Sequence, residues 1–556
     1  MYLASNQSNK NVDLSVAGLG KHHVPGALYD AQPFNAGCME GTRVQLLENT
    51  RRLLITCGGA NIVWIAGMAG TGKTSIALTL CRTLATEPTI ILGGTFFCSR
   101  SSGVIERTDV QRIIPTLAAV LARKSPIYAE ALTKKLKDDP DLAHKSIRVQ
   151  VEHLLVKPIE GLGSLDRQIV FVIDALDECM NEEKLAELIN ALTSSTNSTS
   201  IKILFTSRPE LRIRETSIAD PSLSSIIHLH TIKPAQVTAD IQLYIQRTFE
   251  NAPTAAAWYS HDDIDELTTL SGGLFIFAST ALAYILRRKD VPGRLERLRM
   301  VKMQTSNPTL ATSPLDRMYS HILTQATDPD TLEPAELDET RRIVAIILSA
   351  RAPLTLKGLA EILGLSSEHL RGALDGLHAV ILIPEEDNEG ELRTLHTSFS
   401  DFIFVRAPEH IRIHKEFGHD ELARGCLQRM ASDDLCFNVS RCTTSYKPNP
   451  LIKPDWIASS LIYACLQWAH HVNLASASSL FDNAIETVFR HKLLFWLELL
   501  SVIGEIGRAA VLLRVATSAV SSSICVTSSI ADSHVGEVSG SSIVPPRREL
   551  FRHIFL

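Results

Sequence analysis

The chain has 556 residues, of which 45% are hydrophobic and 21% are charged, as in ordinary globular proteins. One hydrophobic core does not grow to this size, so we expect several domains. The net charge of −6 gives no general attraction to nucleic acid or to anionic membranes, so we expect neither as a partner.

The ten cysteines form no C-x-x-C pair and no Cys/His cluster at zinc spacing. We therefore expect reduced, mostly buried thiols in a cytoplasmic protein. The amino terminus lacks the apolar core of a signal peptide, and the apolar stretches are too short or interrupted to span a bilayer.

The first motif lies between an apolar run and a helical pattern. The run at Ile62–Ala66 predicts a buried strand, and residues 67–74 read GMAGTGKT, which fits the P-loop pattern G-x-x-x-x-G-K-[ST]. Ile76, Ala77 and Leu80 then follow at helical spacing. A helix would thus begin at the loop and point its N-terminus at bound phosphates.

In a P-loop, backbone N–H groups surround the phosphates, the lysine reaches the β- and γ-phosphates, and the Ser/Thr hydroxyl ligates Mg²⁺. Thr74 is therefore a candidate Mg²⁺ ligand. The predicted nucleotide-binding residues here are Gly67, Met68, Ala69, Gly70, Thr71, Gly72, Lys73, Thr74 and Ser75.

The second motif ends another buried strand. Thr89–Phe97 predicts a strand that closes a β-α-β unit, and helices are expected near Val110–Ala122 and Ile147–Leu155. Residues 169–173 are then apolar at every position, which suits a strand covered on both faces.

This strand runs into Asp174, with Asp177 and Glu178 just beyond, which is the Walker B arrangement. Asp174 would hold Mg²⁺ beside the P-loop threonine. Asp177 and Glu178 are candidates to polarise the attacking water. The alternative is that the three acids form a solvated helix start, where negative charge is favourable anyway.

A further buried strand, Ile201–Phe205, leads into Arg208, and Ile226–Leu229 predicts the last strand. Since the carboxyl ends of parallel strands open toward the ligand, Arg208 is a candidate to sense the γ-phosphate or to bridge to a neighbouring element. Alternatively, it caps a turn before Pro209.

The second half of the chain is mainly helical. Helices are predicted at Pro234–Phe249, Ile264–Leu286, Arg341–Ser349, Leu356–Leu363 and Ser367–Leu377, and strands at Val380–Pro384 and Glu391–Leu395. Three helices followed by a hairpin predict a winged helix. Its candidate recognition helix carries one arginine against Glu368 and Asp375, so we expect a packing module rather than a DNA reader. From Phe417 to Arg514 the pattern is helical, with Trp468 and Trp496 in the core.

GMAGTGKT, VFVIDALDE and ILFTSRPE, in this order, resemble the NACHT group of signal-transducing P-loop NTPases (the STAND class), of the kind abundant in mushroom-forming fungi. Flanking stretches such as CMEGTR, FFCSR and GGLFIFAST extend the resemblance over about residues 25–510. No ankyrin, tetratricopeptide or WD repeat is visible.

The resemblance implies a switch that binds ATP or ADP with Mg²⁺, hydrolyses ATP slowly and forms homo-oligomers on activation, with a protein partner that remains unknown. Such switches act in fungal innate-immunity-like recognition, non-self recognition and cell death. ATP is favoured over GTP because no N-K-x-D guanine motif follows the P-loop. His396 stands where related switches place a histidine against the ADP phosphate, although it could instead be a core histidine.

The predicted fold is α/β, a three-layer parallel sheet of the P-loop NTPase type followed by helical-bundle, winged-helix and all-α domains. The alternative functions are a non-catalytic scaffold with a fixed nucleotide and, less favoured, a DNA-handling ATPase. The predicted domains are a disordered segment at 1–24, the α/β NTPase at 25–232, a helical domain at 233–330, a winged helix at 331–405, a helical domain at 406–517 and a low-order tail at 518–556.

Overall fold

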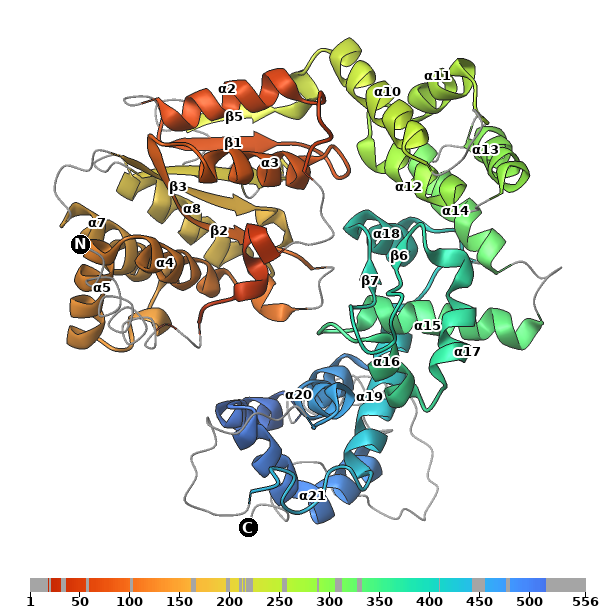
Figure 1. Cartoon of the computed structure of the whole chain (residues 1–556). Helices are drawn as coiled ribbons and strands as arrows, with labels where there is room; N and C mark the ends of the chain where they lie inside the picture. Colours follow the sequence, from red (N-terminus) through yellow and green to blue (C-terminus); the bar gives the residue numbers. More distant parts are fainter. Residues whose placement is uncertain are drawn as a thin grey trace, which may run out of the picture. The chain divides into compact units, whose positions relative to one another are not determined.

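In the computed structural model the chain forms two compact units, residues 1–318 and 319–556 (Figure 1). The tail predicted at 518–556 and most of the segment predicted at 1–24 lie outside the described residues. The structure describes residue 19 and residues 22–516, apart from 32–36, 57–59, 101–103, 162–166, 197–200, 210–212, 214–215, 217–223, 253–257, 288–289, 306–312, 328–332, 410, 443–455 and 477–480.

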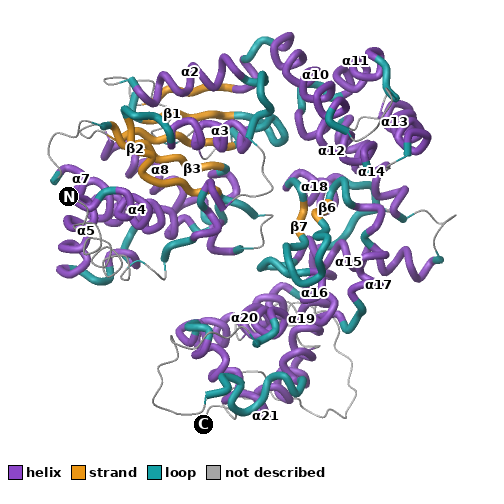
Figure 2. Tube along the Cα trace, in the orientation of Figure 1, coloured by secondary structure: helices purple, strands orange, loops and turns teal. Residues whose placement is uncertain are grey.

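A five-stranded parallel sheet organises the first unit (orange in Figure 2), in the order β2-β3-β4-β1-β5. Its strands are β1 (Ile62–Ala66), β2 (Ile90–Phe97), β3 (Gln168–Asp174), β4 (Ile201–Ser207) and β5 (Ser224–His228). All four neighbouring pairs are parallel. The five predicted strands are confirmed, with ends that shift by one or two residues.

Helices cover both faces of the sheet, so the predicted three-layer α/β fold is confirmed. A hydrophobic core lies on each face of the sheet, and alternate residues of a strand point to opposite cores. Val63 and Ile65 pack with one set of helices, and Ile62 and Trp64 pack with the other. One face carries α2 (Val44–Ile55) and α3 (Lys73–Ala85); the other carries α4 (Ile113–Lys124), α5 (Pro126–Asp138), α6 (Ile147–Gln150), α7 (Lys157–Glu160) and α8 (Glu182–Thr196).

Helices complete the first unit beyond β5: α10 (Pro234–Glu250), α11 (His261–Leu270), α12 (Phe275–Leu286) and α13 (Val291–Thr305), with α14 (Pro314–Ala326) at the boundary. The single helix predicted at Ile264–Leu286 is wrong, because Gly272 and Gly273 adopt φ of +54° and +83° between α11 and α12. Two successive left-handed residues end a right-handed helix.

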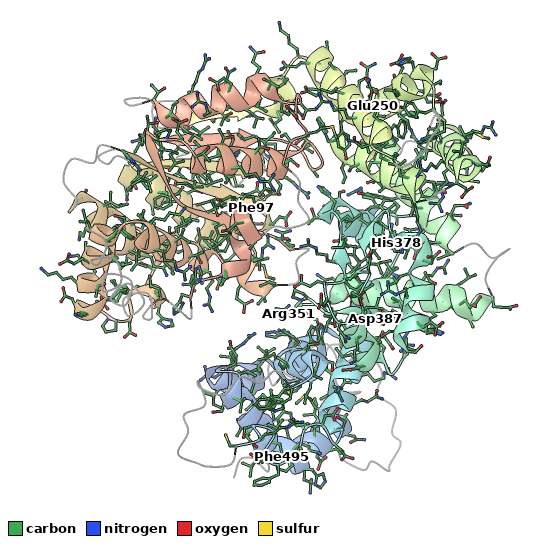
Figure 3. All side chains as sticks on the ribbon, viewed as in Figure 1. Phe97, Glu250, Arg351, His378, Asp387 and Phe495 are labelled. Atoms are coloured by element: carbon green, nitrogen blue, oxygen red, sulfur yellow. The ribbon has the colours of Figure 1, made fainter. Side chains whose placement is uncertain are left out.

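The second unit begins with the expected three helices and hairpin. These are α15 (Pro334–Ser349), α16 (Leu356–Leu363), α17 (Ser367–Ala373), and the antiparallel pair β6 (Ile381–Leu382) and β7 (Arg393–Thr394). Arg371, the arginine of the candidate recognition helix, donates to the Pro384 carbonyl at 2.8 Å and pairs with Asp387 of the hairpin turn (labelled in Figure 3). This arginine is therefore engaged within the unit.

The remainder of the second unit is helical: α18 (Thr397–Asp401), α19 (Lys415–Ala431), α20 (Ser459–Leu474) and α21 (Asp482–Val502). Trp468 and Trp496 are fully buried and meet edge to face, as the sequence predicts. Among the described residues of both units, no helix is both long enough and apolar enough to cross a bilayer.

Candidate nucleotide-binding site

The P-loop connects β1 to α3 at the carboxyl edge of the sheet. Gly70 and Gly72 adopt φ of +78° and +89°, a region open to glycine at little cost. Gly67 donates its N–H to the Ser207 carbonyl of β4 at 3.1 Å, and a Cβ at Gly67 would lie 2.7 Å from Leu229. The loop therefore needs glycine both for its turns and for its close approach to its neighbours.

Lys73, Thr74 and Ser75 form the first turn of α3, and Met68 and Ala69 lie at the start of the loop, with Met68 exposed. Lys73 Nζ donates to the carbonyls of Gly67 at 2.7 Å and Met68 at 3.0 Å. Burial lowers the pKa of Lys73, while the nearby carboxylates of Asp177 and Asp174 oppose that shift. The lysine, the loop and the acids of the second motif thus share one site.

Asp174 is the last residue of β3 and is buried, with 1% of its surface exposed. Its carboxylate accepts a hydrogen bond from the Thr206 hydroxyl, and the Thr74 hydroxyl of the P-loop lies nearby. Burial raises the pKa of Asp174, and the two hydroxyls oppose the rise. A carboxylate beside a threonine hydroxyl is the hard-oxygen chemistry that Mg²⁺ prefers, so these residues fit the predicted metal.

Asp177 and Glu178 lie in the short turn Leu176–Glu178 that follows, and their side chains have different partners. Asp177 is buried; its carboxylate accepts the Arg208 backbone N–H at 2.9 Å and pairs with Arg208 Nε at 3.2 Å. Glu178 Oε2 accepts the Arg100 backbone N–H at 2.8 Å, and desolvation raises the pKa of Glu178 to about 7. Arg208 therefore joins the end of β4 to the turn after β3.

Thr206 and Arg100 belong to the site but were not predicted. Thr206 Oγ1 accepts the Ala175 N–H at 2.9 Å, where Ala175 adopts φ of +56°, and donates to Asp174. Arg100 donates to the carbonyls of Asp177 at 2.7 Å, Glu178 at 3.1 Å and Cys179 at 3.2 Å. Thr206 is the last residue but one of β4, and Arg100 follows β2, which ends at Phe97 (labelled in Figure 3). Both strands lie beside β3, and this position at the carboxyl edge of the sheet is the signal that would have found the two residues.

His396 lies in the second unit, just after β7, and caps α18. It is partly buried, and its Nδ1 accepts the Ser398 backbone N–H at 3.1 Å. The P-loop belongs to the first unit, so the predicted contact between His396 and ADP stays a prediction.

A parallel sheet in this strand order, with a glycine-rich loop before α3 and an acid at the end of β3, defines a P-loop NTPase fold. The family described as nephrocystin 3, N-terminal, matches residues 41–208, which span both motifs and end at Arg208. This match covers less than a third of the chain and supports the P-loop NTPase class. Comparison with curated proteins finds no match.

Solved structures that resemble the chain include the Walker-type ATPase of Pyrococcus abyssi, at 15% identity and a TM-score of 0.32, covering 66% of this chain and 98% of that one. Cdc6p from Pyrobaculum aerophilum matches at 12% identity and 0.32, covering 66% and 96%. The Aeropyrum pernix Orc1 protein, in complex with DNA, matches at 14% and 0.33, covering 70% and 94%. Likenesses this weak carry no information on the activity or the partners of this chain.

Proposed function

We propose that the chain is a nucleotide-dependent switch of the NACHT type, which binds ATP with Mg²⁺ and hydrolyses it slowly. The observation that carries the proposal is that the Thr74 hydroxyl lies close enough to the buried Asp174 carboxylate to oppose the rise of its pKa. The two residues are a hundred positions apart in sequence, yet they meet beside Lys73 at the carboxyl edge of the sheet. A solvated helix start would not require a buried carboxylate beside the P-loop threonine.

In this proposal Thr74 and Asp174 hold Mg²⁺, which, when bound, neutralises charge on the phosphate oxygens. Lys73 donates at present to two loop carbonyls, and the same ammonium group would donate to the β- and γ-phosphates. The N–H groups of residues 68–75 would surround the phosphates.

Glu178 is the better candidate for the base that takes a proton from the attacking water. Its pKa of about 7 is close to the operating pH, which favours general base catalysis. Asp177 is bound through both carboxylate oxygens to Arg208, so we assign it the positioning of Arg208 near the γ-phosphate. Both assignments retain the predicted set of Asp177, Glu178 and Arg208.

The signalling role rests on the ordered motifs of the sequence. A switch of this type would hold ADP at rest, exchange it for ATP on stimulation and then form homo-oligomers, in non-self recognition or cell-death signalling. The engaged Arg371 and the net charge of −6 support a packing role for the winged helix over DNA binding.

The test is to purify the full chain, identify the nucleotide that co-purifies, and measure turnover and assembly state with ADP, ATP and no added nucleotide. We expect bound adenine nucleotide, slow Mg²⁺-dependent hydrolysis and larger assemblies with ATP. Tight binding without turnover or change of assembly would favour a scaffold with a fixed nucleotide. Turnover stimulated by DNA would favour the DNA-handling ATPase.

A further inference from the structure

Arg43 lies outside the two motifs, yet its side chain contacts the P-loop. It precedes α2 in a left-handed conformation, with φ of +56°, and only 3% of its surface is exposed. Its Nη2 donates to the Thr71 carbonyl at 3.2 Å, and its guanidinium carbon lies 5.0 Å from the centre of the Phe275 ring of α12. Its Nε lies 3.9 Å from Asp240 Oδ2 of α10. One buried cation thus joins the P-loop to two helices of the first unit.

The hydrogen bonding of this buried guanidinium is incomplete. Within the described parts of the chain, Arg43 Nε and Nη1 and Asp240 Oδ2 are buried without a hydrogen-bond partner. Burial lowers the pKa of Arg43 and raises the pKa of Asp240, so the surroundings disfavour both charges. Apolar residues of similar volume often replace a buried ion pair without loss of stability. The charged group therefore points to a role other than packing.

That role follows from the orientation of two peptide groups. In a trans peptide the C=O of one residue points opposite to the N–H of the next. The Gly70 carbonyl accepts the Ile276 N–H from the first turn of α12 at 3.1 Å, and the Thr71 carbonyl accepts from Arg43. The N–H groups of Thr71 and Gly72 are consequently directed away from α12 and Arg43. N–H groups of such a loop are the donors that receive phosphate.

The contact with α12 is also tight. Gly70 has φ of +78°, and a Cβ there would lie 2.0 Å from Ile276 Cγ2. No side chain fits between the loop and this helix, so a displacement of α12 would move the loop.

We propose that Arg43 is a positioning residue of the nucleotide site, which orients the Thr71–Gly72 peptide and couples the P-loop to α10 and α12. This inference rests on the proposed function in one respect, namely that the P-loop binds the phosphates of a nucleotide. Arg43 itself acts through the loop. The bonds from Arg43 and from Ile276 to the P-loop carbonyls both orient the loop and join it to the helices. Nucleotide binding and the packing of α10 and α12 are therefore coupled equilibria.

The test compares nucleotide affinity in Arg43→Met, Arg43→Lys and the matched control Arg247→Met, all in the full chain, with a fluorescent ADP analogue and Mg²⁺. Arg247 of α10 donates to the Glu40 carbonyl at 2.8 Å. It therefore joins α10 to the segment before α2, as the contact between Arg43 and Asp240 does, but it has no contact with the P-loop. Methionine keeps much of the arginine's apolar bulk and removes its donors.

We expect affinity to fall about tenfold or more in Arg43→Met and by an intermediate factor in Arg43→Lys, which keeps the charge but lacks the planar fork. Arg247→Met should lower the melting temperature yet bind within about twofold of the parent. Hydrogen exchange should also show that saturating ADP protects α10 and α12 in the parent and protects them less in Arg43→Met.

Parent-like affinity in both Arg43 variants would overturn the inference and leave the P-loop assignment intact. An equal loss in Arg247→Met would also overturn it, because the effect would then be one of general stability. If Arg43→Met does not fold, the affinity of Arg43→Lys decides by the same criterion. If the parent itself binds no nucleotide, the proposed function fails, and this inference fails with it.

Discussion

The ammonium group of Lys73 donates to two carbonyls of the loop that precedes it, and burial lowers its pKa. We expect Lys73→Ala to weaken ATP and ADP binding at least about tenfold, because a hydrogen bond to a charged group contributes about 1.5–3 kcal/mol. Isothermal titration calorimetry measures this directly. Lys124→Ala is the control, since Lys124 also donates to a carbonyl, that of Leu92, and its pKa is also lowered by burial. Equal affinity in parent and Lys73→Ala would refute the phosphate assignment.

The Glu178 carboxylate provides a prediction on pH. A base must be unprotonated, so with a pKa of about 7 the value of kcat/KM for hydrolysis should rise through pH 7 and level off above it. One unit below the pKa, about a tenth of the molecules carry the active form. Glu178→Gln should hydrolyse ATP about 10²- to 10⁴-fold more slowly and retain its affinity for ATP.

Because ATP itself takes up a proton in this range, the residual turnover of Glu178→Gln supplies the control profile. Asp177→Asn is the second comparison; it should keep the pH dependence while it weakens the link to Arg208. A parent profile that coincides with that of Glu178→Gln would remove Glu178 from the role of base.

At the scale of elements, α19 crosses two helices at very short range. A Cβ at Gly418 would lie 2.4 Å from the Ala345 carbonyl of α15, and a Cβ at Gly425 would lie 2.4 Å from the Ile362 carbonyl of α16. The second unit therefore relies on two glycines on one face of a helix, at a cost in helix propensity that the packing of the helices offsets.

We expect Gly418→Ala to lower the free energy of unfolding of the second unit by about 1–3 kcal/mol, since backbone atoms must move apart. Hydrogen exchange of α15 and α19 measures the change locally. The control is Gly372→Ala in α17, an exposed helical position with no atom within 4 Å of an added Cβ. It should raise stability by about 0.5–1 kcal/mol. A neutral Gly418→Ala would show that α19 can shift freely.

A buried chain of polar groups joins α19 to α20. His419 Nδ1 lies 2.9 Å from His471 Nδ1, and His471 Nε2 lies 2.8 Å from the Tyr463 hydroxyl, which accepts the Arg351 backbone N–H at 3.2 Å. Only one proton fits between the two Nδ1 atoms, so the two rings cannot both be charged without breaking the chain. Burial lowers the pKa of His419 to about 4 and that of His471 well below its usual value.

Between about pH 6.5 and pH 4 the unfolded histidines bind protons that the folded ones exclude, so stability must fall as the pH falls. At pH 5 we expect a loss of about 2 kcal/mol from His419 relative to neutral pH, with a further loss from His471, measured by hydrogen exchange of α19 and α20. His419→Gln should reduce this loss. An unfolding free energy that does not change from pH 7 to pH 5 would contradict the buried neutral pair.

At the scale of the whole molecule, the P-loop and His396 belong to different compact units. A switch of the proposed type requires a ligand that binds one arrangement of such units more tightly than another, since only differential affinity shifts a conformational equilibrium. His396 is the predicted link, through the β-phosphate of ADP.

If this link exists, His396→Ala should release ADP faster and populate the open or oligomeric form without a stimulus. One hydrogen bond to a charged group contributes about 1.5–3 kcal/mol, which corresponds to about a ten- to hundredfold shift in population. ADP dissociation and melting temperature are measured on the same variant. An unchanged dissociation rate together with a lower melting temperature would identify His396 as a residue of the fold alone.

The sequence alone was sufficient for the sheet and for the core of the site. Strands β1 and β4 and the interior of β3 are buried at every position, so their apolar runs are visible without any partner being known. The P-loop is contiguous, and Asp174 ends the apolar run of β3, so both can be read from the local order of residues. The split of Ile264–Leu286 was missed, although Gly272 and Gly273 are visible in the sequence.

Only the tertiary structure decided which distant residues contact the P-loop, Asp174 and the turn that follows Asp174. Arg100 donates to the Glu178 carbonyl, 78 positions away in the sequence. Thr206 of β4 donates to Asp174 of the neighbouring strand β3, and Arg43, which precedes α2, donates to the P-loop. The buried pair of His419 and His471 likewise joins two helices. Hydrophobic periodicity indicates which face of a helix or strand is buried, but it does not indicate which polar groups on that face form hydrogen bonds with each other. Hydrogen bonds are short and directional, so their partners are set only once the strands and helices have packed.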